Sequence, residues 1–102
     1  MRTHPKKKIE IVVEAPLRSR LLGLLDRLEV SGYTVLPAVA GRGHHGAWEE
    51  GHISDADRMV VVVCLVDSGR LDAILDAVYG ALAERIGIVY VADVAVVRPD
   101  HF

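Results

Sequence analysis

The hydrophobic positions of this chain follow two kinds of pattern, one typical of strands and the other typical of helices. Residues 8–14 (KIEIVVE), 33–39 (YTVLPAV), 58–66 (RMVVVVCLV) and 87–97 (GIVYVADVAVV) are rich in β-branched residues, which predicts four strands. Pro37 lies in the second segment, and because proline cannot donate to a sheet ladder, it favours an edge strand or a bulge. The third segment is almost continuously apolar, which indicates that both of its faces are covered.

Two further segments carry apolar residues at three- and four-residue spacing, which predicts two amphipathic helices. The first follows Pro16, whose fixed φ suits a first helical turn, and we expect it to end at Gly32. The second begins after Ser68, a good N-cap residue, and ends near Arg85. The apolar positions are Leu17, Leu21, Leu24, Leu25 and Leu28 in the first helix, and Leu71, Ile74, Leu75, Val78 and Leu82 in the second.

The resulting order of elements is β-α-β-β-α-β within 102 residues. It predicts a single α+β, ferredoxin-like domain, in which an antiparallel four-stranded sheet carries both helices on one face. The other face of the third strand would then need a different cover, and a second copy of the chain is the simplest candidate. Residues 1–7 are predicted to form a flexible tail and residues 98–102 a short C-terminal tail.

The connection between the second and third strands, residues 41–54 (GRGHHGAWEEGHIS), is long and has no regular pattern. It contains four of the nine glycines, three of the five histidines and the only tryptophan. Connections longer than about 12 residues are usually functional or unstructured in a compact domain. We therefore predict a mobile loop that binds a partner, with His45, Trp48, Glu49 and Glu50 as the contacting residues.

Composition argues against several classes of function. The net charge of −2 provides no broad basic surface, so no nucleic-acid partner is expected. No apolar run approaches the roughly 20 residues of a membrane span, and no apolar signal segment follows the N-terminus, so we expect a cytoplasmic protein. Cys64 lies within the apolar third strand, where a buried, inert thiol is expected.

The loop histidines His44, His45 and His52 raise the alternative of a trimeric divalent-metal-binding protein, because neutral imidazole binds zinc and nickel well. No Cys-x-x-Cys pair accompanies them, so no specific metal site is predicted. An enzyme is also not expected, because the sequence suggests no pairing of a nucleophile with a base.

Several segments together resemble the PII-like signalling proteins over essentially the whole chain. They are SGYTV after the first helix, the loop opening GRG, the strand MVVVVCLVD and the closing segment IGIVYVADVAVVRPDHF. The loop opening and the closing segment are most similar to the carboxysome-associated and bicarbonate-transporter-associated branch. The resemblance implies a homotrimer with an adenine nucleotide in each cleft between subunits. It also implies bicarbonate as a second candidate ligand and a membrane transporter or carboxysome-related protein as the target.

The same resemblance implies which residues surround the nucleotide. They are Thr34, Val63 and Leu65 near the base, Gly41, Arg42, Gly43 and His44 at the start of the loop, Gly87, Ile88 and Val89 around the phosphates, and Arg98 and His101 from the C-terminal end. PII proteins proper have a longer glycine-rich loop with a lysine where this chain has Gly87 and Ile88, and a pair of arginines near the end. With fewer cations to compensate a triphosphate, AMP, ADP or a cyclic nucleotide is expected to bind better than ATP.

Overall fold

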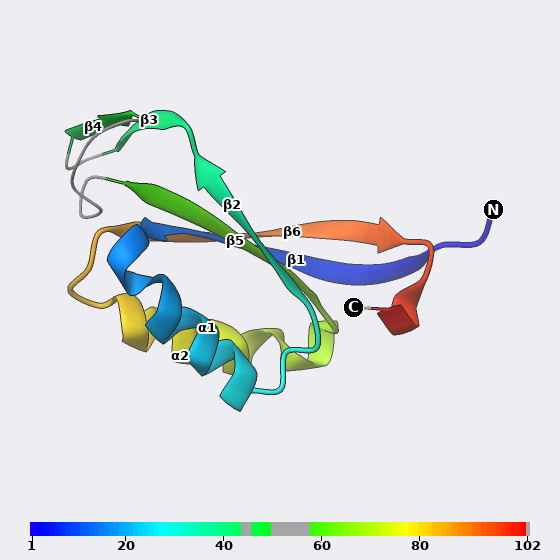
Figure 1. The fold of residues 1–102 in the computed structure, drawn as a ribbon. Coiled ribbons are helices and arrows are strands. Elements are labelled where there is room, and N and C mark those ends of the chain that lie inside the picture. Colours follow the sequence, from blue (N-terminus) through cyan, green and yellow to red (C-terminus); the bar gives the residue numbers. More distant parts are fainter. Residues whose placement is uncertain (44–45, 50–57, 102) are drawn as a thin grey trace.

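The fold is an antiparallel four-stranded sheet with two helices on one face, as Figure 1 shows. The computed structural model describes residues 1–43, 46–49 and 58–101. The strand order in the sheet is β2-β5-β1-β6. The bounds are β1 His4–Glu14, α1 Arg18–Arg27, β2 Tyr33–Ala38, β5 Met59–Val66, α2 Leu71–Leu82 and β6 Gly87–Val96. The predicted ferredoxin-like order is therefore confirmed, and of the two alternatives for Pro37, an edge strand or a bulge, the structure shows the edge strand.

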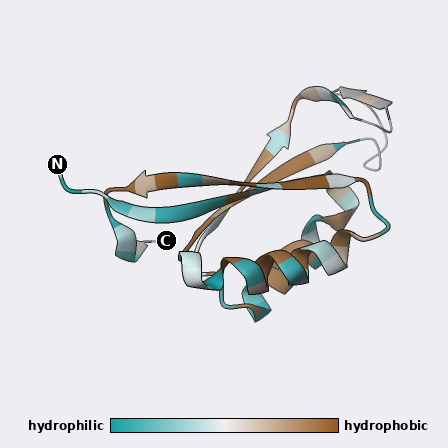
Figure 2. Cartoon of the chain, turned by 180° about the vertical axis from the view of Figure 1, so that it is seen from behind, coloured by the Kyte–Doolittle hydropathy of each residue, from teal (hydrophilic) through white to brown (hydrophobic). Residues whose placement is uncertain are grey.

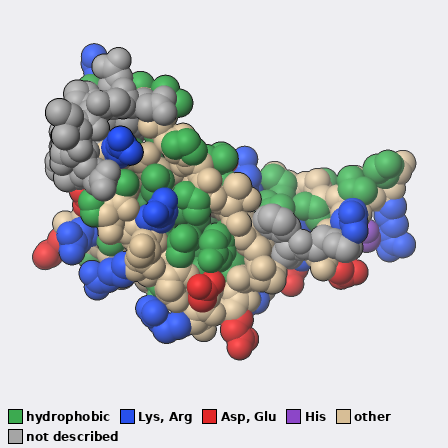
Figure 3. Space-filling model, in the orientation of Figure 1, with side chains coloured by type: hydrophobic (Ala, Val, Ile, Leu, Met, Phe, Trp, Pro, Cys, Tyr) green, Lys and Arg blue, Asp and Glu red, His purple; other side chains and the backbone are tan. Residues whose placement is uncertain are grey.

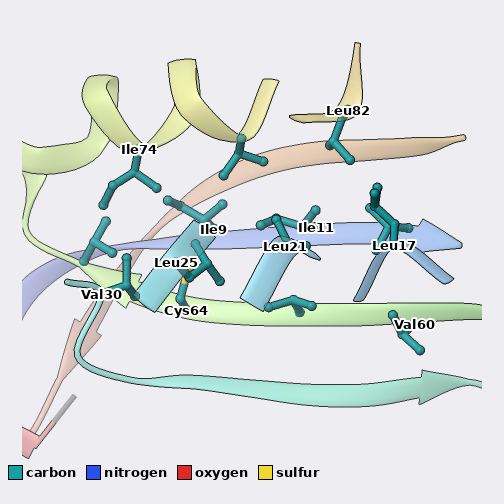
Figure 4. Packing of buried hydrophobic residues seen from close by; sticks show 14 residues of the cluster. Ile9, Ile11, Leu17, Leu21, Leu25, Val30, Val60, Cys64, Ile74 and Leu82 are labelled. Atoms are coloured by element: carbon teal, nitrogen blue, oxygen red, sulfur yellow. The ribbon is translucent and has the colours of Figure 1, made fainter. Parts of the chain in front are cut away.

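The core lies between the sheet and the two helices. Alternate residues of β1 and β5, such as Ile9, Ile11, Val62 and Cys64, are fully buried because a strand turns every second side chain to the same face. The helices meet them with the apolar positions that the spacing predicts (Figure 4). The buried helical residues are Leu17, Leu21, Leu25, Ile74, Val78 and Leu82.

The C-terminus of α1 differs from the prediction. Glu29, and not Gly32, closes the helix, with a left-handed φ of 58°. The Glu29 N–H donates to the Asp26 carbonyl and the Val30 N–H donates to the Leu25 carbonyl, each at 3.0 Å, which is the Schellman pattern. Val30 is buried against the core, so packing of this residue supports the turn and compensates for a non-glycine residue at positive φ.

The N-terminus of α2 also differs from the prediction. Ser68 is not an N-cap, because it lies inside a 3₁₀ turn, Ser68–Arg70, that precedes the helix. Asp67 stands before this turn, and neither it nor Arg70 caps a helix with its side chain. Pro16, in contrast, lies in the opening turn of the first helical segment, where its fixed φ fits, as predicted.

The chain pairs more extensively at its N-terminus than its polar sequence predicts. The first strand begins at His4, and not at residue 8, because residues 4–7 pair with the last residues of β6, from His4 opposite Val96 to Lys7 opposite Asp93. Pairing of β1 with β5 begins only at Lys7, so the end of the sheet is a two-stranded ribbon. This ribbon projects past the helices and lengthens the molecule to 45 × 29 × 21 Å (Figure 1).

Part of the predicted irregular loop is regular. Residues 40–43 form β3 (Ala40–Gly43) and residues 46–49 form β4 (Gly46–Glu49), and the two strands pair as an antiparallel ribbon. Arg42 pairs with Ala47 and Gly41 with Trp48. Antiparallel backbone pairing therefore extends into the start of the loop. The glycines in this segment allow the pairing, but their low strand propensity does not predict it. The short C-terminal segment after β6 contains a 3₁₀ turn, Pro99–His101.

Candidate functional site

The two helices leave the other face of the sheet open, and this open face is largely apolar. One row across it consists of Leu36, Val61, Val12 and Ile88, which are successive pairing partners on β2, β5, β1 and β6. Leu36 is 48% exposed and Ile88 is 59% exposed, although both are large apolar residues in strands. In Figure 2 the helices lie on one side of the sheet only, and β5 is coloured mostly hydrophobic whereas the projecting N-terminal half of β1 is hydrophilic. Within the described part of the chain, β5 is thus buried on one face, and the predicted second cover is not supplied.

The next row across the open face contains two of the nucleotide candidates. Thr34 pairs with Val63, Val63 pairs with Glu10, and Glu10 pairs with Tyr90. Thr34 is exposed at the edge strand and Val63 is partly buried. The hydroxyl and the apolar side chain therefore stand side by side on an accessible surface.

Glu10 is the centre of a polar network in this row. The Tyr90 hydroxyl donates to Oε2 of Glu10, and the Lys8 ammonium lies 3.0 Å from Oε1. The Tyr90 hydrogen bond is the larger of the two effects that lower the pKa of Glu10, and the Lys8 contact is the second. The same hydrogen bond raises the pKa of Tyr90. Glu10 is therefore a carboxylate with a donor on each oxygen.

Three more candidates, Gly87, Ile88 and Val89, lie at the start of β6, and each has a different environment. Gly87 lies against β1 so closely that a Cβ would be 2.8 Å from the Val12 carbonyl oxygen and 3.0 Å from Cγ1 of Val13. Ile88 points to the open face and Val89 packs against the core on the helix side. A packing requirement thus accounts for the glycine, independently of any ligand.

The start of the loop lies near this end of the sheet. β3 follows β2 after one residue, and the end of β2 pairs with the start of β5, which pairs in turn with the end of β1 beside Gly87. Arg42 and Gly43 are exposed, and Gly41 is partly exposed. His44, His45, Glu50 and His52 lie outside the described residues, and of Trp48 and Glu49 only the backbone is described.

The C-terminal candidates lie at the other end of β6. Arg98 is exposed and follows the strand directly, and His101, described in its backbone only, ends the last 3₁₀ turn. Gly87 and Val96 begin and end β6, so they are separated by about 30 Å at about 3.3 Å per residue. Figure 3 shows Lys and Arg side chains at the tip of this projecting end. In one chain, the loop start and Gly87 therefore lie at one end of β6 and Arg98 follows its other end, with the row of Thr34 and Val63 between them.

Sequence comparison identifies the family. The model of the nitrogen regulatory protein P-II family matches residues 6–101. The chain belongs to the P-II family. A search of curated proteins finds no match.

Solved structures of PII-like proteins resemble this chain along nearly its whole length. CPII, a nitrogen regulatory PII-like protein from Thiomonas intermedia K12 bound to ADP, AMP and bicarbonate, matches with a TM-score of 0.86 and 29% identity, covering 96% of this chain and 93% of CPII. CPII bound to ADP and bicarbonate matches with a TM-score of 0.83 and 32% identity, covering 96% and 94%. A PII-like signaling protein from Thermus thermophilus matches with a TM-score of 0.81 and 28% identity, covering 96% and 95%.

Two other properties of this PII-like chain concern the alternatives. Among the described residues, no group of three or more His, Cys, Asp and Glu side chains is arranged to hold a metal ion. Within the same residues, no helix is both long and apolar enough to cross a membrane.

The sequence patterns did not single out Glu10, Tyr90 or Arg70, although each makes specific contacts in this PII-like chain. Alternation along KIEIVVE places Lys8 and Glu10 on one face, which is a usable signal. The contact with Tyr90 depends on the β1–β6 register across 80 residues, which periodicity does not supply. Arg70 donates to the carbonyls of Leu28 and Glu29, at 3.1 Å for the latter, and so ties the start of α2 to the end of α1.

Proposed function

We propose that this protein is a PII-like regulatory sensor that binds an adenine nucleotide in clefts between copies of itself. AMP, ADP or a cyclic nucleotide is favoured over ATP, and bicarbonate is the second ligand. Nucleotide occupancy switches the segment 41–54, which then binds or releases a target in inorganic-carbon uptake, such as a membrane transporter or a carboxysome-related protein. The protein acts in the cytoplasm, by binding and not by catalysis.

The observation that carries this proposal is the likeness to CPII, which is bound to ADP and bicarbonate in a structure that is 32% identical over 96% of this chain. The family match over residues 6–101 supports a regulatory role. The chemistry of the candidate residues is compatible with the ligands, because Arg42 and Arg98 supply guanidinium groups that suit phosphate or carbonate oxygens.

The separation of the candidates supports a site between subunits. The loop start and Gly87 lie at one end of β6, and Arg98 follows its other end, about 30 Å away at the usual strand rise. This separation favours a site to which two chains contribute, one providing the loop start and Gly87 and the other Arg98. The uncovered apolar face, with Leu36 and Ile88 exposed, supports association of identical subunits, for which we propose a homotrimer.

The preference among nucleotides follows from charge. Gly87 and Ile88 offer no cation to the phosphates, so Arg42 and Arg98 are the arginines proposed to compensate them. Two guanidinium groups match the charge of a monophosphate or diphosphate better than that of a triphosphate. Segment 41–54 can respond only if the nucleotide binds its two states with unequal affinity.

Isothermal titration calorimetry with AMP, ADP, ATP and cyclic AMP, each with and without bicarbonate, tests the proposal. We expect ADP or AMP to bind more tightly than ATP, and Arg98→Ala to weaken binding by about 10-fold or more, as loss of a charged hydrogen bond does. Arg20→Ala, on the exposed surface of α1, is the control and should leave the affinity unchanged. If none of the four nucleotides binds to the folded oligomer, the proposal is wrong.

The metal-binding alternative has a separate test. The histidines that motivate it, His44, His45 and His52, lie outside the described residues. Titration of zinc and nickel into the protein and into the triple alanine variant at these positions distinguishes the two functions. Metal affinity that is lost in the variant, together with no nucleotide binding, would favour the alternative.

A further inference from the structure

The open face of the sheet carries a polar network within an apolar surround. Lys8 and Tyr90 hold the two carboxylate oxygens of Glu10, and all three residues lie on the face that the two helices leave open. The row on one side of Glu10 is the apolar set Leu36, Val61, Val12 and Ile88. The row on the other side places Leu65 and Ala92 beside Lys8.

The network is complete within one chain. Glu10 accepts from the Tyr90 hydroxyl at one oxygen and lies 3.0 Å from the Lys8 ammonium at the other. The Lys8 side chain is 34% exposed and that of Glu10 20% exposed, so the pair is mostly covered before any partner binds. Further along the face, Lys6 pairs with Asp67, which also leaves no net charge at that point.

Because the charges on the open face are neutralised by ion pairs within one chain, the face favours one kind of partner. Identical copies that meet around a symmetry axis bring identical charges toward each other, so a net charge on the shared face would repel itself. A charge that is buried without a partner is strongly unfavourable, whereas a paired and hydrogen-bonded one is tolerated. A face whose charges are neutralised within each copy suits a second copy of the same chain, whereas a charged partner would gain little from it.

We propose that Lys8 and Tyr90 determine self-association, because they hold Glu10 in a neutralised, hydrogen-bonded state in which the open face can be buried against a second copy of this chain. This inference rests on the proposed association of subunits and adds the residues that permit it. The network contributes modestly to the isolated fold, since its members are partly exposed there and exposed ion pairs are weak. We therefore expect its larger effect on assembly, where the same charges become buried.

Four variants test the inference. Lys8→Met leaves Glu10 with an unpaired charge, Tyr90→Phe removes one donor, and the double variant Lys8→Met with Glu10→Leu removes the charge and its partner together. Lys7→Met is the matched control, because Lys7 is the next residue along β1, pairs with Asp93 and points to the opposite face. Subunit dissociation is measured by analytical ultracentrifugation over a concentration series, and folding by circular dichroism.

We expect Lys8→Met to raise the subunit dissociation constant by at least about 10-fold, and the double variant to return to within a few-fold of the unmodified protein. Tyr90→Phe should give a smaller increase in the subunit dissociation constant. If Lys8→Met does not fold, the Tyr90→Phe variant is used for the test instead. The control Lys7→Met should assemble normally. Equal assembly of Lys8→Met and Lys7→Met, or no recovery in the double variant, would overturn the inference.

The same samples separate this inference from the proposed function. If the unmodified protein associates and binds ADP while Lys8→Met does both equally well, the network inference alone is wrong. If the unmodified protein stays monomeric at all concentrations, the open face serves an occupant other than a second copy, and the inference is overturned. ADP titration of that monomer then decides separately whether nucleotide binding survives.

Discussion

Gly87 approaches Val12 so closely that a Cβ on the glycine would lie 2.8 Å from the valine carbonyl oxygen. The contact joins the first residue of β6 to the central strand β1, at the end of the sheet where the loop 41–54 begins. The nearest atom is backbone, which cannot turn away as a flexible side chain could. The glycine is therefore required by the packing of the sheet, whatever ligand lies near it.

Gly87→Ala should destabilise the protein by about 1–3 kcal/mol, because the added methyl group forces β6 away from β1. Gly80→Ala is the control: a Cβ there meets nothing within 4 Å, and the residue lies inside α2. That variant should gain about 0.5–1 kcal/mol, since alanine favours a helix over glycine. Urea unfolding of both variants checks the pair, and a Gly87→Ala protein as stable as the unmodified one would contradict the packing argument.

Arg70→Ala should lower stability by about 1 kcal/mol, since its guanidinium donates to the carbonyls of Leu28 and Glu29 at the end of α1. Arg70→Lys should recover part of the loss, because an ammonium can reach one carbonyl but lacks the planar fork. Arg20→Ala, on the exposed face of α1, serves as the control. Thermal unfolding gives the comparison, and equal losses in Arg70→Ala and Arg20→Ala would contradict a specific role for the two hydrogen bonds.

Burial raises the pKa of the Cys64 thiol from 9.0 to about 11. The reactive thiolate is therefore about 100-fold scarcer than for an unperturbed thiol at the same pH. Iodoacetamide should react with Cys64 very slowly at pH 8 and rapidly once urea unfolds the chain. Mass spectrometry of the two reactions checks this, and rapid labelling of the folded protein would show that the core opens readily.

The raised pKa of Cys64 also makes the free energy of unfolding depend on pH. A thiol with a raised pKa in the folded state contributes stability that is fully present below pH 9 and is lost as pH rises toward about 11. Cys64→Ala, which has no thiol to ionise, should lose less stability than the unmodified protein over that interval. Urea midpoints at pH 8 and pH 10.5 measure the difference.

Glu10 is expected to make the protein acid-sensitive. Its pKa is lowered from 4.5 by the Tyr90 hydrogen bond and then by Lys8, so its contribution is present above about 4.5 and is lost as pH falls through the lower folded value. Among the described residues, the titratable groups facing it are Lys8 on its own strand and Tyr90 on β6, since its β5 partner is Val63. Urea midpoints between pH 5 and pH 3 should therefore fall less steeply for Glu10→Gln than for the unmodified protein. Glu84→Gln, an exposed position just after α2, is the control variant.

The sequence by itself determined the order of elements, the two buried helix faces, the edge position of the Pro37 strand and the buried Cys64. Each of these features depends on local spacing or residue type. A period of two in a strand, or of about 3.6 in a helix, indicates which side chains face the core. The resemblance in SGYTV, GRG and IGIVYV also led to the P-II family, which the family match over residues 6–101 confirmed.

Only the tertiary structure decided the features that depend on long-range register. Strand pairing at residues 4–7, the Tyr90 contact with Glu10 and the approach of Gly87 to Val12 join the two ends of the chain. Glu29 replaced Gly32 as the helix terminator because buried Val30 stabilises the turn, which a residue preference cannot anticipate. The division of the candidate site into two ends of β6 has the same origin. The sequence shows which residues have suitable chemistry. The distances between them depend on the register in which the strands pair.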